Sequence, residues 1–189
     1  MLLMDRSRKE DDRTEELLGI SDIIRLDGSR CPYPPPASIL TAVQDCANGS
    51  LRETSNSKVL KVAVAELLGV AEDNVLLCCC PAAAYACEGI SVSDRSWLLR
   101  QEKSNLQDKT VNLYDLGRCF GLLGVNAWAL IAPKETAGEL AGICAKLKIN
   151  EPDKVASTAI MAAAKDPVNV GKWRSMVENT LLRAKHLLT

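Results

Sequence analysis

Aromatic side chains and histidine are both scarce in this sequence. Phe, Trp and Tyr together make up only 4% of the 189 residues, so a hydrophobic core must be built mainly from Ala, Val, Leu and Ile. His186 is the only histidine, and it falls near the end of a predicted C-terminal helix, where a basic group complements the helix dipole. With one histidine and no paired nucleophile, neither a catalytic triad nor a histidine-based metal site is available.

A charge excess of one sign and long apolar runs are also absent. Lys and Arg number 23 against 24 Asp and Glu, a net charge of -1, whereas a general nucleic-acid binder carries a basic excess. No apolar run reaches the roughly 20 residues of a membrane-spanning helix. The charged N-terminus has neither the apolar stretch of a secretory signal nor the acid-poor composition of a transit peptide. We therefore expect a cytoplasmic protein with no nucleic-acid partner and no membrane span.

The eight cysteines lack the spacing of a metal site or a redox motif. No Cys-x-x-Cys pair occurs, and the cysteine triplet at 78–80 continues an apolar run at 75–77 that predicts a buried strand. Adjacent strand residues point to opposite faces, so these three thiols cannot close one tetrahedral site. In an intracellular chain such thiols stay reduced and pack as small hydrophobic side chains, so no metal is expected.

Hydrophobic periodicity predicts a helix-rich α/β protein of one domain's length. The segment 1–22 is predicted to be a charged, flexible tail, and 23–189 the main unit. Three helices are predicted in the first part of the chain: 39–47 with a stop at Asn48-Gly49, 57–68 with a stop at Gly69, and 96–103. Three more are predicted after residue 133. They start at the capping box Thr136-Ala137-Gly138-Glu139, at Asn150 and at Pro167. Predicted strands cover 74–80, 110–114 and 127–132.

Two stretches of the chain are similar to one enzyme family. The first is Ile24-Arg25-Leu26-Asp27, followed by a Pro-Tyr pair that ends at Tyr33, a helix, and apolar segments at 67–70 and 74–76. The second, 115–125, reads Asp-Leu-Gly-Arg-Cys-Phe-Gly-Leu-Leu-Gly-Val. In order and spacing they resemble histidinol-phosphate aminotransferases, which are class I/II, fold-type I enzymes that use pyridoxal 5'-phosphate (PLP). The resemblance runs from residue 23 to the C-terminus and implies an incomplete fold-type I PLP-transferase fold with a reduced central sheet.

The departures from the family pattern fall on the cofactor positions. Family members read Ser/Thr-x-Ser-Lys-x-Phe-Gly-Leu-x-Gly-Leu-Arg, and the lysine forms the Schiff base with PLP. Arg118 stands at that lysine's position, and a guanidinium has no free amine for this bond. Asn126 replaces the arginine that holds the PLP phosphate, and Gly117 replaces a serine whose hydroxyl reaches it. Asp115 replaces Ser/Thr with a carboxylate that repels a phosphate, so the resemblance implies a degenerate site without a catalytic residue.

A second group of departures lies upstream. The family's Asn-Gly-Ser-Asp-Glu turn, which cups the phosphate with backbone N–H groups, aligns with 79–83. Pro81 has no N–H to donate, and Cys80 does not adopt a positive φ as readily as glycine. Tyr33, in the Pro-Tyr pair of the first stretch, is retained from the family's cofactor-binding residues. Arg52 falls near the position of a tyrosine that reaches the partner's cofactor in the family's dimers.

Most of the family's large domain is missing between the two stretches. The main unit divides into an N-terminal segment, 23–83, a short connector, 84–110, and a segment after the lysine motif, 111–189. The missing part would hold the Asp that pairs with the pyridine nitrogen of PLP and the aromatic residue that stacks on its ring. We expect the strands around Val75, Val111 and Leu130 to have few neighbours, which would leave apolar surface for an interface.

Three functions remain open. The first is a non-catalytic aminotransferase-like protein (a pseudoenzyme) that serves as an interaction or structural subunit of a homo-oligomer or a larger assembly, with no cofactor. The second is a PLP-dependent aminotransferase of the histidinol-phosphate type, intact or weakly active, with PLP as cofactor. The third is a truncated gene product without a function of its own. Catalysis would need another lysine, such as Lys109 or Lys134. It would also need a partner for the pyridine nitrogen of PLP, for which the candidates are Asp94, Asp108 and Asp115. We expect both lysines to be solvated charges, and we therefore favour the first function.

Overall fold

The computed structural model describes residues 33–50, 57–95 and 106–188, which belong to one compact unit, Cys31–Thr189. The predicted tail at 1–22, the motif at 24–27, Arg52 and the predicted helix at 96–103 lie outside the described residues. The second stretch of resemblance, 115–125, is described in full.

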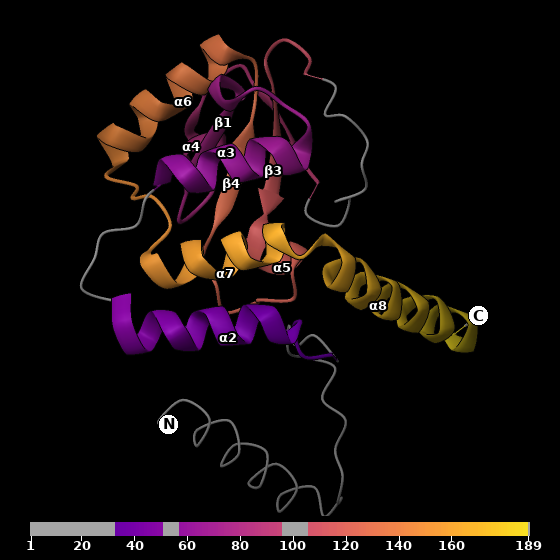
Figure 1. The fold of residues 1–189 in the computed structure, drawn as a ribbon. Helices are drawn as coiled ribbons and strands as arrows, with labels where there is room; N and C mark the ends of the chain where they lie inside the picture. Colours follow the sequence, from indigo (N-terminus) through magenta and orange to yellow (C-terminus); the bar gives the residue numbers. More distant parts are fainter. Residues whose placement is uncertain (1–32, 51–56, 96–105, 189) are drawn as a thin grey trace, which may run out of the picture. The chain divides into compact units, whose positions relative to one another are not determined.

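A mixed sheet of four strands forms the centre of this unit (Figure 1). The strands are β1 Val75–Cys78, β2 Ser91–Asp94, β3 Thr110–Asp115 and β4 Trp128–Ile131, in the spatial order β1-β4-β3-β2. β4 is antiparallel to both of its neighbours, whereas β2 and β3 are parallel. The three strands predicted from sequence are confirmed with slightly shorter or longer bounds, and β2 is an additional strand.

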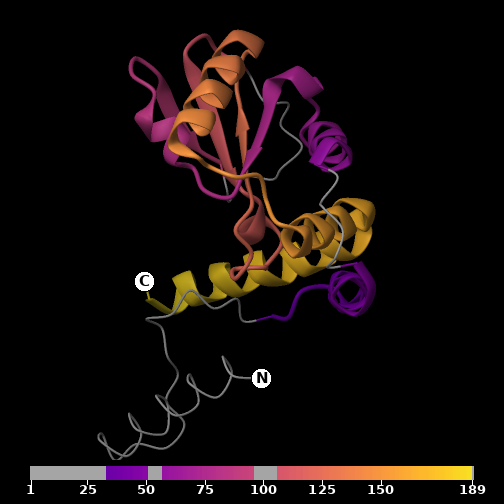
Figure 2. The same ribbon diagram turned by 90° about the vertical axis from the view of Figure 1, so that its left-hand side faces the viewer.

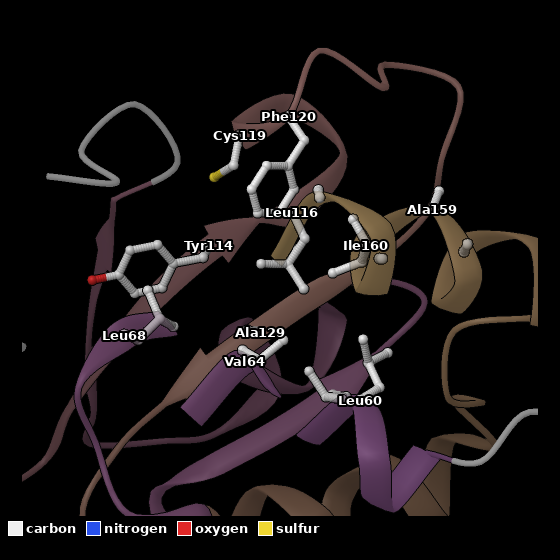
Figure 3. Close-up of a cluster of buried hydrophobic side chains, with 14 of the residues drawn as sticks. Leu60, Val64, Leu68, Tyr114, Leu116, Cys119, Phe120, Ala129, Ala159 and Ile160 are labelled. Atoms are coloured by element: carbon white, nitrogen blue, oxygen red, sulfur yellow. The ribbon is translucent and has the colours of Figure 1, made fainter. Parts of the chain in front are cut away.

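Three helices contribute side chains to the core on one face of the sheet. They are α2 Ala37–Asp45, α3 Ser57–Leu68 and α7 Lys154–Lys165. Their apolar stripes join Leu77, Tyr114 and Ile131 of the sheet in one buried cluster, in which Leu60 and Ile160 are at most 1% exposed. Figure 3 shows side chains of α3 and α7 converging on this cluster. α2 lies alongside α7 in both views of the fold (Figures 1 and 2).

Two further helices, α4 Ala82–Ala86 and α6 Lys134–Leu147, cover the opposite face. Leu140 of α6 packs there with Val111, Leu113 and Leu130. Helices on both faces of a sheet confirm the predicted helix-rich α/β class. The expectation that the strands around Val75, Val111 and Leu130 have few neighbours is wrong, because the helices of both faces bury all three residues to 1% exposure or less.

Two predicted helix boundaries also differ from the structure. The first helix does not stop at Asn48-Gly49 but continues as a π-helical turn, Cys46–Ser50. α6 begins at Lys134 after Pro133, so Thr136 lies inside the first turn, where it is buried, and is not the cap. Pro133 precedes the helix in an extended conformation, with φ -52 and ψ 147, which the fixed φ of proline allows. Gly69, with φ +65, ends α3 as predicted, and a short 3-10 turn, Glu72–Asn74, leads into β1.

The chain ends in a long helix, α8 Pro167–Leu188. Val170 and Trp173 in its first two turns are buried, whereas Met176 and Leu182 are exposed. Its start is tied to α2, because the Ser38 hydroxyl donates a hydrogen bond to Asp166 at 2.6 Å. Across the described ranges, no helix is both long and apolar enough to span a membrane.

Candidate functional site

The strand register brings the segments of the predicted site to one edge of the sheet. Cys78 at the end of β1 pairs with Trp128 at the start of β4, and Trp128 pairs with Asp115 at the end of β3. β2 ends at the same edge, since the backbone N–H of Arg95 donates to the carbonyl of Leu113. We call this row of paired residues, with the segments 79–81 and 116–126 that leave it, the Asp115 edge. Carboxyl ends of neighbouring parallel strands are a common place for ligand sites in α/β proteins.

Asp115 caps the short helix α5 Leu116–Cys119. Its Oδ1 accepts a hydrogen bond from the backbone N–H of Arg118 at 2.9 Å, as expected of an N-cap aspartate. The neighbouring Leu116 is fully buried, and its N–H donates to the carbonyl of Ala127 at 2.9 Å. The carboxylate at this position therefore fixes the turn after β3.

Arg118 occupies the position that the resemblance assigns to the PLP lysine. Its Nε lies 3.8 Å from Oδ2 of Asp115, and its side chain is 36% exposed. A guanidinium remains protonated at every physiological pH, so it offers a permanent positive charge and no nucleophilic amine. The arrangement suits an ion pair and excludes a Schiff base at this residue.

Gly117 lies where the backbone is too crowded for a side chain. A Cβ at this position would overlap the carbonyl oxygen of Val125 and lie 2.8 Å from that of Leu122. The N–H of Leu122 donates to the carbonyl of Gly117 at 2.7 Å, and the N–H of Val125 donates to the carbonyl of Leu122 at 2.8 Å. The loop therefore closes onto Gly117, and a serine does not fit there without moving the backbone.

The same loop is packed against α8 through Gly121. This residue has φ +73, and a Cβ on it would overlap the indole ring of Trp173. Tyr33 is bound to α8 as well: its carbonyl accepts from Nε1 of Trp173 at 3.5 Å, and its hydroxyl lies 2.7 Å from Oγ1 of Thr180. The sequence pattern gave no sign of these contacts between distant segments. Tyr33 therefore has a structural partner on α8.

Asn126, Cys80 and Pro81 complete the Asp115 edge. Asn126 is exposed at the end of the loop, one residue before the buried Ala127. Pro81 precedes α4, and Cys80 is half-buried in the bend before it. α4 has only five residues, and its first residues follow a proline that has no N–H, so this turn offers few of the donors that hold a phosphate.

The buried thiols near this edge are neutral. Burial, reinforced by the neighbouring Cys144 and Cys80, raises the pKa of Cys78 to about 12. Burial and then the charge of Asp115 also raise the pKa of Cys119 far above its ordinary range, while Arg174 opposes this shift. Neutral thiols are poor nucleophiles and poor metal ligands. Within the described residues no group of three or more His, Cys, Asp or Glu side chains could hold a metal ion.

The lysines considered as replacements lie at the opposite edge of the sheet. Lys109 is exposed immediately before β3, in a turn with φ 56. Lys134 follows β4, and its Nζ lies 2.7 Å from Oδ2 of Asp73. This exposed pair raises the pKa of Lys134 and lowers that of Asp73 through their hydrogen bond. Asp108 is exposed beside Lys109, whereas Asp94 is exposed at the Asp115 edge and His186 on α8.

Comparison with known proteins gives structural matches only. No protein-family model matches the sequence, and no curated protein matches it. Among solved structures, it is similar to histidinol-phosphate aminotransferase from Sinorhizobium meliloti in complex with PLP, with 13% identity, a TM-score of 0.65, and 92% of this chain and 72% of that chain covered. For a double mutant of Thermus thermophilus aspartate aminotransferase, the sequence identity is 11% and the TM-score is 0.71, and the match covers 95% of this chain and 74% of that chain. For aspartate aminotransferase from Thermotoga maritima, the sequence identity is 12% and the TM-score is 0.67, and the match covers 96% of this chain and 76% of that chain.

These identities are low, so the likeness concerns the fold. It agrees with the helix-rich architecture and the small mixed sheet described above. The chain therefore has the fold of the fold-type I, PLP-dependent aminotransferases, with a central sheet of four strands in its described part.

Proposed function

We propose that this chain is a non-catalytic aminotransferase-like protein that acts as an interaction or structural subunit. The observation that carries the proposal is Arg118, which stands at the position of the PLP lysine and lies 3.8 Å from the carboxylate of Asp115. The guanidinium of Arg118 cannot form the Schiff base, and it lies beside the carboxylate that caps its own helix. This arrangement supports a structural role for the turn and not a catalytic role.

The other residues of the Asp115 edge do not fit PLP. Gly117 has no room for the serine of the family pattern, and Asn126 is an exposed neutral amide where the family has an arginine. Pro81 cannot donate to a phosphate, and Asp115 places a negative charge beside the phosphate region. Several ligand contacts are lost together, and each such contact to a charged group is typically worth about 1.5–3 kcal/mol.

A role as a subunit would use apolar side chains that are exposed in the described part of the chain. Large apolar residues with exposed fractions between 38% and 68% occur on helices of both faces, in the loop after α5 and on α8: Leu40, Val59, Tyr85, Leu123, Leu147, Val168, Met176 and Leu182. Each of these side chains is open to contact with another protein. We propose a homo-oligomer or a larger assembly.

The cofactor half of the proposal is tested by titrating the purified chain with PLP, reducing it with borohydride and mapping adducts by mass spectrometry. We expect no stoichiometric adduct on any lysine. A single reduced adduct on one lysine, together with aminotransfer to an oxo-acid, would establish the alternative of a PLP-dependent aminotransferase. The Arg118→Lys variant is the matched control, and we expect it to remain without transaminase activity because Gly117, Asn126 and Pro81 are unchanged.

The subunit half is tested by light scattering coupled to size-exclusion chromatography. We expect a defined species larger than one chain, or a defined complex when the chain is purified from its source. A stable monomer that recovers no partner would refute the subunit role. A chain that is unfolded by circular dichroism would instead indicate a truncated product without a function of its own.

A further inference from the structure

Polar side chains of β2 and β3 lie on the face of the sheet that packs with α3. Val92 of β2 is paired with Val111 of β3, and both pack into the apolar cluster on the α6 side. Strand alternation therefore places the next pair, Ser93 and Asn112, side by side on the α3 side. Because neighbouring strands are about 4.8 Å apart, one small ligand can touch both of these side chains.

Asn112 is a buried amide whose side chain is not used by the fold. It is 4% exposed, and among the described residues no group is hydrogen-bonded to its side chain. Every described side-chain N or O atom without a hydrogen bond keeps some contact with solvent, so the amide of Asn112 is open to the outside. Buried amides in folded proteins are nearly always hydrogen-bonded, so an amide in this state indicates a place for a ligand.

Arg95 brings a positive charge to the same place. Its backbone N–H donates to the carbonyl of Leu113 at 2.8 Å, which continues the pairing of β2 with β3 by one residue. Its Nε donates to Oγ of Ser93 at 3.1 Å, so the guanidinium lies over the α3 side of the sheet next to Asn112. The side chain is half-buried, and no carboxylate of the described residues forms an ion pair with it.

The acidic residues of these two strands belong to the opposite face. Asp94 alternates with Arg95 and shares the α6 side with Val92, and Asp115 shares that side with Leu113. The α3 side of β2 and β3 therefore carries one positive charge and polar groups that donate hydrogen bonds. A group with a single negative charge matches this arrangement.

We propose that Arg95, Ser93 and Asn112 bind the carboxylate of a small organic acid. The terminal N–H groups of Arg95 fit the two oxygens of a planar carboxylate. The hydroxyl of Ser93 accepts from Arg95, so its own proton is available to donate, and the amide of Asn112 supplies a further N–H. The ring of Tyr114, which follows on the same face of β3, lies beside Leu68 (Figure 3), and this apolar surrounding favours an acid with an aromatic or apolar body. This site uses none of the residues aligned with the cofactor positions, so it does not depend on the proposed subunit role.

The test is calorimetric titration of the full-length chain with sodium benzoate at constant ionic strength. We expect one benzoate to bind per chain, and Arg95→Gln to weaken binding about ten-fold or more through the loss of charged hydrogen bonds. Arg183→Gln, at an exposed position of α8, is the matched control and should bind as the unchanged chain does. Benzamide has the same ring without the charge, and inorganic phosphate has a larger charge without the ring, so both should bind more weakly than benzoate. The proposal is overturned if benzoate does not bind, if either of these probes binds as tightly, or if the two arginine variants behave alike.

A second variant separates a ligand-binding amide from a structural one. Leucine is close to asparagine in size but has no polar atoms, so Asn112→Leu should weaken benzoate binding several-fold. Because the amide of Asn112 has no hydrogen-bond partner among the described residues, the same change should raise the urea midpoint of the ligand-free chain. A lower midpoint, or benzoate binding equal to that of the unchanged chain, would show that the amide serves the fold and would overturn its assignment to the site. Circular dichroism verifies that each variant is folded before titration.

Discussion

Replacing Gly117 by alanine should destabilise the protein strongly, although it adds a single methyl group. The new Cβ would overlap the carbonyl oxygen of Val125 and lie 2.8 Å from that of Leu122, closer than the 3.0 Å below which Cβ contacts essentially never occur. Both obstacles are backbone atoms, so no side-chain rotation relieves them. The loop must shift, which strains the hydrogen bonds from Leu122 to Gly117 and from Val125 to Leu122.

The magnitude follows from these two effects. Overpacking in a well-packed site costs about 1–3 kcal/mol, and two weakened hydrogen bonds add about 0.5–1.5 kcal/mol each, so we expect a loss of about 2–6 kcal/mol. This is a large part of the roughly 5–15 kcal/mol that stabilises an ordinary domain. Gly117→Ser should cost at least as much, because its hydroxyl adds volume at the same place.

Urea unfolding followed by circular dichroism measures this loss as a lower midpoint with little change in slope. Gly124→Ala in the same loop is the matched control, since a Cβ there meets nothing within 4 Å. It should leave stability unchanged or raise it by about 0.4–1 kcal/mol through the unfolded state. If Gly117→Ala and Gly124→Ala unfold at the same urea concentration as the unchanged chain, the described closure of this loop is refuted.

Three further outcomes follow from the structure. Gly121→Ala should lower the urea midpoint markedly, because φ +73 disfavours any side chain and the indole of Trp173 fills the space; an unchanged midpoint would contradict this contact. Gly142→Ala, on the exposed side of α6 with nothing within 4 Å, should raise stability by about 1 kcal/mol in the same assay. Alkaline pH should destabilise the fold. The buried thiols of Cys78 and Cys119 keep their protons in the folded state above the ordinary thiol pKa of about 8.5, whereas the unfolded chain loses them. The free energy of unfolding should therefore fall by about 1.4 kcal/mol per pH unit for each thiol. Cys119→Ala should flatten that slope, and an equal slope in both proteins would contradict the reasoning.

The sequence pattern predicts those elements whose signal is local. The helix at 57–68 has the bounds expected from its apolar spacing, and β3 and β4 lie where short apolar runs predict strands. β2 reads Ser-Val-Ser-Asp, and this sequence has too few apolar residues to predict a strand. Its strand conformation comes from parallel pairing with β3. The order β1-β4-β3-β2 depends on contacts between distant segments, which periodicity does not contain.

The candidate site shows the same division. The resemblance to aminotransferases predicted which residues stand at the cofactor positions. The strand register places Asp115 in one row with Cys78 and Trp128, and Cys80 and Asn126 lie two residues from that row along the chain. The resemblance did not predict why Gly117 is a glycine, because the crowding comes from carbonyl oxygens of a loop that must first fold. The contact between Gly121 and Trp173 likewise joins segments that no local pattern connects.

The turn from Asp115 to Gly121 can be explained by packing alone, without a bound cofactor. Asp115 caps the helix, Leu116, Cys119 and Phe120 enter the core, and Gly117 and Gly121 allow close approach of backbone and indole. The family pattern at this turn would need a lysine in place of Arg118 and also a serine in place of Gly117, which the closed loop does not accept. Each single substitution toward the family pattern would therefore lower stability or leave that pattern incomplete, so packing by itself favours the present residues of this turn.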